Sequence, residues 1–131
     1  VYPDGTLCGT GTVDRAVVVA GGTLAPGGAG GVLTVASNVT FAAGSTLAVT
    51  VGAAGADRLA CGAAVALDGA LTVTVADGFQ PRANQEWEIV TASGGLSGDF
   101  TSRNAPGFVV EKESDRVIVR YLAKGTAVLL R

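Results

Sequence analysis

The chain has 131 residues, of which 48% are hydrophobic and 5% aromatic, and its 9 basic and 11 acidic side chains give a net charge of −2. A chain of this length suits one domain with a single core. The slightly acidic balance excludes the basic face that nucleic-acid binding requires. Histidine, the commonest general base and metal ligand, is absent. We therefore predict no catalytic residues, no metal site and no cofactor.

The predicted elements are short strands separated by glycine-rich turns. Apolar residues alternate with Thr or Ala at Val32–Val35, Leu47–Val51 and Leu71–Val75, which is typical of strands with one buried face. Further strands are predicted at Ala16–Val19, Val65–Leu67, Trp87–Thr91, Phe108–Lys112, Arg116–Leu122 and Thr126–Leu130. No window has a helical period, and no apolar run approaches the roughly 20 residues of a membrane-spanning helix. We expect an all-β protein that does not span a membrane.

Small turn motifs ending in leucine recur along the chain, at Gly5–Leu7, Gly21–Leu24, Gly44–Leu47, Gly69–Leu71 and Gly94–Leu96. Leucines spaced by roughly 17 to 25 residues indicate a solenoid, in which stacked units bury a core that one unit cannot bury alone. Each unit is interpreted as a turn, a leucine, and one or two short strands. The predicted solenoid core contains Leu24, Leu33, Val35, Leu47, Val49, Leu71 and Val73.

The glycines and Pro26 are interpreted as corner residues of these units, because corners bend sharply and several require a positive φ. Glycine-rich sequence is also typical of flexible linkers. A linker lacks the regularly placed leucines and the alternating strands, which favours the solenoid.

The sequence changes in character near Phe79. Most of the aromatic residues follow this point, and we expect five of them to cover the end of the core: Phe79, Trp87, Phe100, Phe108 and Tyr121. Glu113-Ser114-Asp115 is interpreted as a hairpin turn. Because an open solenoid end exposes core and unpaired strand edges, residues 1–78 are predicted to form solenoid units, and residues 79–131 the last units plus an antiparallel C-terminal cap.

Three blocks of sequence carry a resemblance to a known family. They are GGTLAPGGAGGVLTV (21–35), FAAGSTLAVTVGAAGADRL (41–59) and LDGALTVTVADGFQPRANQEWEIVTASGGLSGDF (67–100). In order and composition they resemble the autotransporter-associated β-strand repeat proteins, bacterial surface passengers of the Planctomycetes and Verrucomicrobia type, over about residues 5–122.

The resemblance implies a right-handed parallel β-helix located outside the cytoplasm, exported with its signal removed. The family's members are mostly adhesins, stalks and surface layers, and their repeats carry no catalytic residues. Neither an outer-membrane barrel nor a sorting helix follows the repeats, so we expect a fragment, or a mature subunit cut at both ends.

The two cysteines, Cys8 and Cys61, match no zinc-binding spacing. In an oxidising compartment two cysteines suggest a disulfide, but stacked units place these residues several layers apart. Three interpretations stay open: buried small hydrophobic residues, an intrachain disulfide, or a disulfide between subunits.

Four polar motifs are candidate ligand-binding or modification sites. Asp57-Arg58 is either a ligand-facing pair or, as we favour, a surface ion pair at a corner. Asp68-Gly69 and Asp77-Gly78 suggest either calcium turns or, as we favour, ordinary turns. Asn38-Val39-Thr40 matches a glycosylation sequon, which in a bacterial protein is usually coincidence.

Glu86 and Glu88 flank Trp87 and suggest a carbohydrate platform with paired carboxylates. On a strand, however, both glutamates share one face and Trp87 takes the other. Trp87 is therefore most simply a core or cap aromatic.

The leading functional hypothesis is a non-catalytic extracellular structural protein that builds a fibre, stalk or filament by head-to-tail stacking of identical copies. The strand that would complete a neighbour's sheet is Thr126, Ala127, Val128, Leu129 and Leu130. The alternative is an adhesin that recognises a host glycan or surface protein through an exposed stripe: Gln80, Arg82, Asn84, Gln85 and Trp87. A polysaccharide lyase or hydrolase ranks last, because the charges are scattered.

Overall fold

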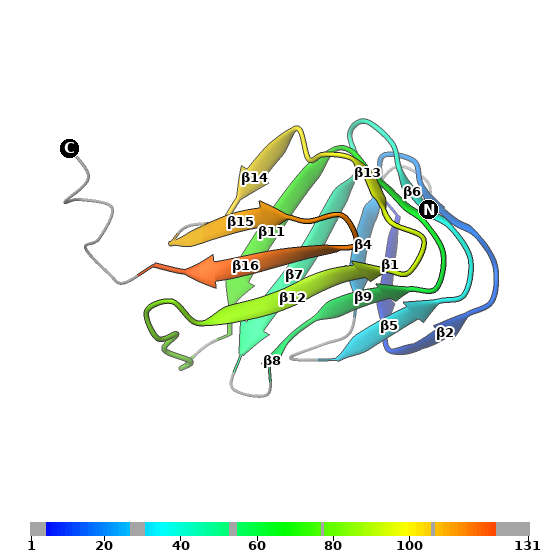
Figure 1. The fold of residues 1–131 in the computed structure, drawn as a ribbon. Coiled ribbons are helices and arrows are strands. Elements are labelled where there is room, and N and C mark those ends of the chain that lie inside the picture. The colour runs from blue at the N-terminus through cyan, green and yellow to red at the C-terminus, as the bar shows by residue number, and fades with distance from the viewer. Residues whose placement is uncertain (1–4, 27–30, 53–54, 77, 106, 123–131) are drawn as a thin grey trace.

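The computed structural model describes residues 5–26, 31–52, 55–76, 78–105 and 107–122. Within these ranges the chain forms short strands joined by turns, and no helix (Figure 1). Most strand pairs are parallel. The predicted all-β class is confirmed.

The strands form three sheets. Sheet A contains, in spatial order, β1 (Thr6–Gly9), β4 (Thr23–Pro26), β7 (Thr46–Gly52), β11 (Ala70–Val75) and β14 (Ser102–Asn104). Sheet B contains β2 (Gly11–Val13), β5 (Val32–Val35), β9 (Arg58–Cys61), β12 (Glu86–Ala92), β16 (Arg116–Tyr121) and β15 (Phe108–Lys112). Sheet C contains β3 (Val17–Val19), β6 (Val39–Phe41), β10 (Val65–Leu67) and β13 (Leu96–Gly98). The short β8 (Gly55–Ala56) pairs antiparallel with the end of β7.

From β1 to β14, apart from β8, the chain visits sheets A, B and C in turn, and each strand pairs in parallel with its counterpart from the previous visit. The first unit is β1, β2 and β3, and the second is β4, β5 and β6. The expectation of one or two strands in each unit is therefore wrong, since each unit contains three. Several of these strands have only three residues, which is too short for apolar alternation to identify them.

Parallel register places like residues on top of one another. In sheet A, Leu7, Leu24, Leu47 and Leu71 occupy one row across four strands. In sheet B, Leu33 lies beside Leu59, which lies beside Val90. All seven predicted core residues are buried, and Leu24, Leu47 and Leu71 are fully inaccessible to solvent. Burial of these rows supplies the main stabilising free energy of the fold.

Two details of the repeat differ from the prediction. The fifth leucine, Leu96, lies in sheet C opposite Val65, and Arg103 of β14 takes its expected place next to Leu71. Pro26 is not a corner residue but the buried last residue of β4, in register with Gly9. Proline has no N–H to donate to the ladder, so Pro26 is tolerated at the end of this strand.

The last two strands form an antiparallel hairpin, as predicted. β15 and β16 pair around Glu113-Ser114-Asp115, where Glu113 N–H donates to the carbonyl of Arg116 at 2.8 Å. β16 also pairs antiparallel with β12, with a bulge between Glu88 and Val90. The hairpin thereby takes the position beside β12 that the next parallel strand of sheet B would occupy (Figure 1).

Four of the five late aromatic residues form a row of edge-to-face contacts. Ring centroids are 6.2 Å apart for Phe79 and Trp87, 6.1 Å for Trp87 and Phe108, and 5.2 Å for Phe108 and Tyr121. Phe79, Trp87 and Phe108 are partly buried against the core, and Phe100 lies inside it. Such pairs each add about 1 kcal/mol beyond burial. The predicted final strand, Thr126–Leu130, lies outside the described residues.

Candidate functional site

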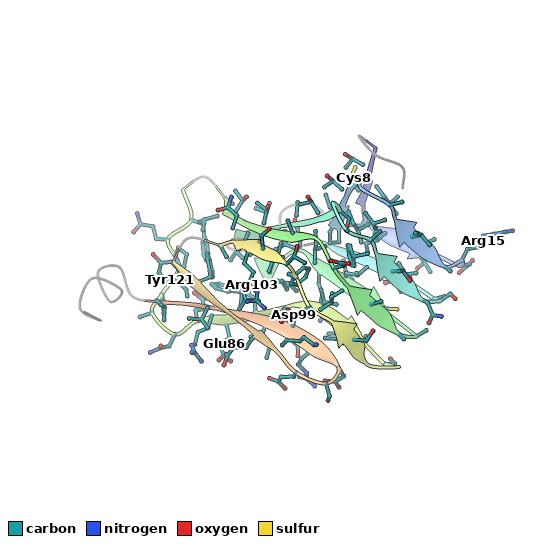
Figure 2. All side chains as sticks on the ribbon, turned by 90° about the horizontal axis from the view of Figure 1, so that it is seen from above. Cys8, Arg15, Glu86, Asp99, Arg103 and Tyr121 are labelled. Carbon is teal, nitrogen blue, oxygen red and sulfur yellow. The ribbon has the colours of Figure 1, made fainter. Side chains whose placement is uncertain are left out.

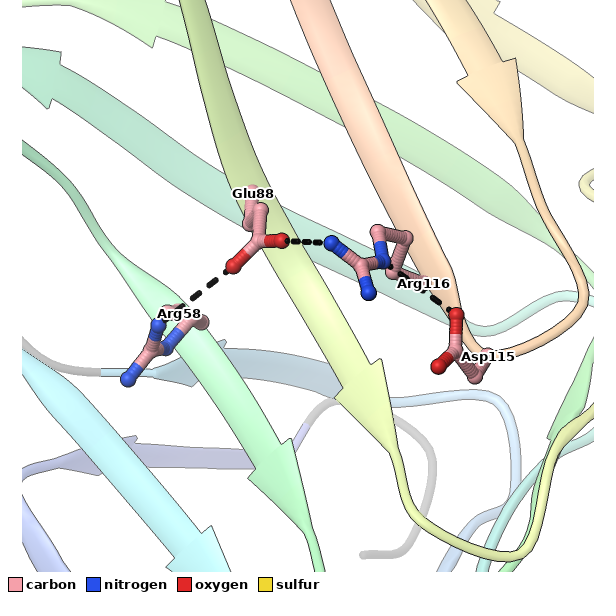
Figure 3. A network of polar contacts seen from close by, with 4 residues as sticks. All are labelled: Arg58, Glu88, Asp115 and Arg116. Atoms are coloured by element: carbon pink, nitrogen blue, oxygen red, sulfur yellow. Dashed lines mark hydrogen bonds and ion pairs between the residues drawn. The ribbon is translucent and has the colours of Figure 1, made fainter.

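Charged side chains gather on the outer face of sheet B, where the hairpin meets the parallel strands. Glu88 of β12 lies between two arginines: its carboxylate is 3.7 Å from Nη1 of Arg58 on β9 and 2.6 Å from Nη1 of Arg116 on β16. Arg116 also contacts Asp115 through Nε at 3.2 Å. Figure 3 shows this row of alternating charges, which crosses three neighbouring strands.

A second group of ion pairs continues the row along the hairpin. Arg120 of β16 lies opposite Glu86 in the ladder, and its Nη1 is 3.8 Å from Glu86 and 3.1 Å from Glu111 of β15. Each carboxylate in the two groups thus has an arginine partner. We refer to the outer-face side chains of Arg58, Glu86, Glu88, Glu111, Asp115, Arg116 and Arg120 as the charge ladder.

Strand alternation explains why the charge ladder forms. Glu86 and Glu88 point outward to the arginines, whereas Trp87 packs against the core, as the sequence predicts. On β16, Arg116 and Arg120 alternate with the fully buried Val117 and Val119. The bulge places Ile89 and Val90 in succession in the core, both fully buried.

The two halves of β12 have different neighbours. Val90–Ala92 pair with β9, whereas Glu86–Glu88 pair only with β16 among the described strands. At this divergence lies an open depression of about 390 Å³, lined by Val32, Ala56, Arg58, Glu86, Trp87 and Glu88. A second, of about 310 Å³, lies across Glu88 and is lined by Glu88, Thr91, Ala92, Ser93, Asp115 and Arg116.

The ion pairs of the charge ladder link the hairpin to the parallel strands of sheet B. The hydrogen bond to Asp115, the charge of Asp115 and the charge of Glu88 raise the pKa of Arg116. Side chains of the ladder are 32% to 52% exposed, so solvent screens each pair and its contribution to stability is small. The ladder's arginines, Arg58, Arg116 and Arg120, nearly balance its four carboxylates, and every one of these carboxylates contacts an arginine. The ladder holds the hairpin to the parallel strands.

A separate ion pair lies at the last strand of sheet A. Asp99 Oδ1 is 2.8 Å from Nη2 of Arg103, and it also accepts a hydrogen bond from Phe100 N–H at 2.8 Å. Burial opposes ionisation of Asp99, but these hydrogen bonds and the charges of Arg103 and Lys112 hold its pKa below the usual 3.8. Lys112 Nζ also donates to the carbonyl of Gly98. Figure 2 shows Asp99 and Arg103 together.

The structure places the two cysteines as free thiols in different environments. Cys61 is 4% exposed, and its Sγ donates to the carbonyl of Ser37 at 3.0 Å, which fits a buried small residue. Cys8 is exposed on β1 at the N-terminal end of the stack (Figure 2). The intrachain disulfide is therefore absent from this structure, while a bond between subunits stays a prediction.

The other residues that were candidate sites make hydrogen bonds with nearby backbone groups. Asp57 is not a surface residue: it is 5% exposed and accepts a hydrogen bond from Thr50 N–H. Asp68 accepts a hydrogen bond from Gly69 N–H at 2.7 Å, as an ordinary turn does. Asn38 is exposed, and its Oδ1 accepts from Ala64 N–H of the next unit. Asp77 lies outside the described residues.

Of the residues in the stripe predicted for adhesion, Gln80, Arg82 and Asn84 are exposed, whereas Gln85 and Trp87 are partly buried. Asn84, with φ of 65°, donates its N–H to the carbonyl of Tyr121, and Gln85 Oε1 accepts from Arg82 N–H. These contacts dock the loop onto β16. The aromatic face of Trp87 is occupied by Phe79 and Phe108.

Sequence reasoning did not identify Arg116, Arg120, Glu111 or Arg103 as a group. A signal was present, since the charged residues concentrate between Asp99 and Arg120. Their pairing depends on which strands are neighbours, and the sequence alone did not provide the antiparallel placement of β16 beside β12.

Comparisons with protein-family models and with curated sequences identify no relative of this chain. No protein-family model matches the chain, and no curated protein sequence is significantly similar to it. Among the described residues, no group of His, Cys, Asp and Glu side chains is arranged to hold a metal ion. In the same part of the chain, no helix has the length and apolar character needed to cross a membrane.

Proposed function

We propose that this chain is a non-catalytic structural protein: a segment of a right-handed parallel β-solenoid that serves as part of a bacterial surface stalk or fibre. The observation that carries the proposal is the in-register row of Leu7, Leu24, Leu47 and Leu71. A fold made of stacked equivalent units extends along one axis, and its stability is a sum of contacts between neighbouring units.

The placement of polar groups supports the same role. The outer face of sheet A carries uncharged side chains, among them Thr23, Thr46, Thr50, Thr72 and Thr74. Every carboxylate of the charge ladder is paired with an arginine, and Phe79, Trp87 and Phe108 of the aromatic row pack against the core. These features stabilise the molecule and leave no group prepared for chemistry, which favours a mechanical role over an enzymatic one.

Location outside the cytoplasm and membership of the autotransporter-associated repeat proteins belong to the proposal. They rest on the repeated blocks of sequence and on the parallel stacking with which those blocks are compatible. Exposed Cys8 is compatible with an oxidising compartment only if a partner thiol from another molecule is available.

Head-to-tail stacking of copies meets an obstacle at the described C-terminal end. The last strand of sheet A carries Arg103 in the leucine row, so stacking on β14 would place its guanidinium against Leu7 of the next copy. Head-to-tail growth therefore depends on Thr126–Leu130, the strand predicted from the sequence to complete a neighbour's sheet.

Pulling the protein by its two ends in a force spectrometer tests the mechanical role. Leu47 and Leu71 are register partners, so one unit contains about 24 residues and releases ~8 nm of chain when it unfolds. We expect force peaks with spacings that are multiples of this length, and lower peak forces for Leu47→Ala. Extension without a force peak would overturn the role.

The adhesin alternative is tested separately on a glycan array. Packing of Trp87 between two phenylalanine rings weighs against it. Specific binding that is lost in Arg58→Ala would instead identify the depression beside β12 as a ligand site and make binding the main function.

A further inference from the structure

The charge ladder contains one more carboxylate than it has arginines. Its members are Glu86, Glu88, Glu111, Asp115, Arg58, Arg116 and Arg120. Glu86 and Glu111 share a single arginine, Arg120. The carboxylate with the longer contact to that arginine keeps the larger part of its charge for another partner.

The contact distances identify Glu86 as that carboxylate. Arg120 Nη1 donates a hydrogen bond to Glu111 at 3.1 Å but lies 3.8 Å from Glu86, beyond hydrogen-bonding distance. Among the described residues, Glu86 has no other ion-pair partner, and its side chain is 52% exposed. Glu88, two residues along the strand, has a close arginine partner at 2.6 Å. Glu86 is therefore the least neutralised carboxylate of the charge ladder.

Glu86 lines the open depression of about 390 Å³ beside β12. Adjacent residues of a strand point to opposite faces, so a depression lined by Glu86, Trp87 and Glu88 follows the edge of β12. Figure 1 shows β9 and β12 diverging toward β8 at this place. Val32, Ala56 and Trp87 give the depression an apolar wall, and each is only partly buried. A carboxylate beside an apolar wall is suited to a cation that has an apolar stem.

The other two charges that line the depression belong to Arg58 and Glu88, which contact each other at 3.7 Å (Figure 3). Arg58 Nε is inaccessible to solvent and has no hydrogen-bond partner among the described residues. An anionic ligand therefore cannot bind Arg58 through Nε and Nη together, and it would meet two carboxylates. With two carboxylates and one guanidinium, the lining has a net negative charge that favours a cation.

The edge of β12 also directs backbone groups to the depression. Tyr121 N–H donates to the carbonyl of Gln85, so Gln85 faces β16. Alternation along an antiparallel ladder then turns the N–H and C=O groups of Glu86 and Glu88 away from β16, toward the depression. Among the described strands, Glu86–Glu88 pair only with β16. These backbone groups suit a ligand that carries peptide groups as well as a cation.

We propose that the depression beside β12 binds a lysine side chain of a partner polypeptide, with the ammonium at Glu86 and the methylene stem along Val32, Ala56 and Trp87. An ammonium donates three hydrogen bonds, which a carboxylate and nearby carbonyl oxygens accept. The four-carbon stem of lysine buries against apolar surface while the charge stays near solvent. This site is independent of the structural role proposed above, since neither requires the other.

Tryptophan fluorescence measures occupancy directly, because Trp87 is the only tryptophan of the chain and lines the depression. The probes are N-acetyl-lysine N-methylamide, its norleucine analogue, which lacks the ammonium, and n-butylammonium chloride, which lacks the peptide groups. We expect a saturable change in emission with the lysine probe, and binding at least about threefold weaker for each of the other two. Added salt should weaken the lysine probe most, because its ammonium contacts an exposed carboxylate.

Three variants locate the site. Glu86→Gln keeps the shape of the side chain without its charge, and should remove the preference for the lysine probe over the norleucine probe. Asp115→Asn removes a ladder carboxylate that does not line this depression, and should bind like wild type. Arg120→Gln removes the cation that competes for Glu86, and should tighten binding. Circular dichroism melts check that each variant folds.

Several results would overturn the site. They are an emission that the lysine probe leaves unchanged, equal binding of the lysine and norleucine probes, and a lysine preference that survives in Glu86→Gln. Binding of n-butylammonium as tight as that of the lysine probe would overturn the assignment to a polypeptide and would leave a site for free amines.

Discussion

Gly69 illustrates how closely neighbouring units approach at a corner. It has φ of +74°, and a Cβ at this position would lie 2.2 Å from the carbonyl oxygen of Ser45 in the previous unit. Ser45 is itself buried, and its carbonyl accepts a hydrogen bond from Ala70 N–H. The corner therefore has no room for a side chain on Gly69.

We expect Gly69→Ala to lower the free energy of unfolding by about 2–4 kcal/mol, through the unfavourable φ and the overlap with Ser45. Gly44→Ala is the matched control, because Gly44 has φ of +83° but open space around its Cβ position. It should cost only about 1 kcal/mol. Urea denaturation of both variants measures the difference, and equal losses would contradict the close approach.

Individual core residues were predictable from the sequence, whereas polar partners were not. Leu33 and Val35 are buried as their alternation indicates. Asp57 was misassigned because one residue decides which side of a strand or turn a side chain faces. Arg58, its neighbour, reaches Glu88 of a strand that the sequence does not place beside it.

At the scale of one element, β14 shows how an edge strand ends a sheet. It is only three residues long and is exposed throughout. Its Arg103 replaces leucine in the row of sheet A, and the ion pair with Asp99 fixes the preceding corner. A charge at the end of an apolar row discourages pairing with further strands.

The Asp99–Arg103 contact should make stability depend on pH in a narrow acidic range. Because the folded-state pKa of Asp99 lies below the usual 3.8, its contribution is present above that value and is lost as pH falls through the folded-state pKa. Asp99 is about half exposed, so the contribution is at most about 0.5 kcal/mol.

Comparison of wild type with Asp99→Asn measures this contribution. The difference in unfolding free energy should be present at pH 6 and shrink toward zero between about pH 4 and pH 2. A difference for Asp99→Asn that is unchanged by acid would contradict the assigned ion pair.

Strands were predictable in proportion to their length. β7 and β11 have six or seven residues and alternate clearly, so the sequence locates both. β2, β13 and β14 have three residues each, and no periodic pattern can be recognised over so short a run. They form because a neighbouring strand, β5, β10 or β11, provides the edge on which they pair.

For the whole molecule, the repeat of leucines correctly indicated parallel stacking but not three strands in each unit. The distance between leucines measures the length of a unit and says nothing about how many times the chain turns within it. The charge ladder was unpredictable for a related reason, since it joins the repeated part to a hairpin of opposite direction.

A stack of units should lose structure from its ends, because an outer unit has one neighbour and an inner unit has two. β7, β9 and β10 pair on both sides, whereas β1, β2 and β3 pair on one side within the described chain. At the C-terminal end, the charge ladder and the Asp99–Arg103 pair add contacts that the N-terminal end lacks. The two ends should therefore differ in local stability.

Amide hydrogen exchange followed by mass spectrometry measures this gradient. In dilute protein, exchange should be fastest in residues 5–19, slower in residues 96–104, and slowest in residues 46–67. Uniform exchange from β1 to β11 would mean that the units unfold as a single cooperative block.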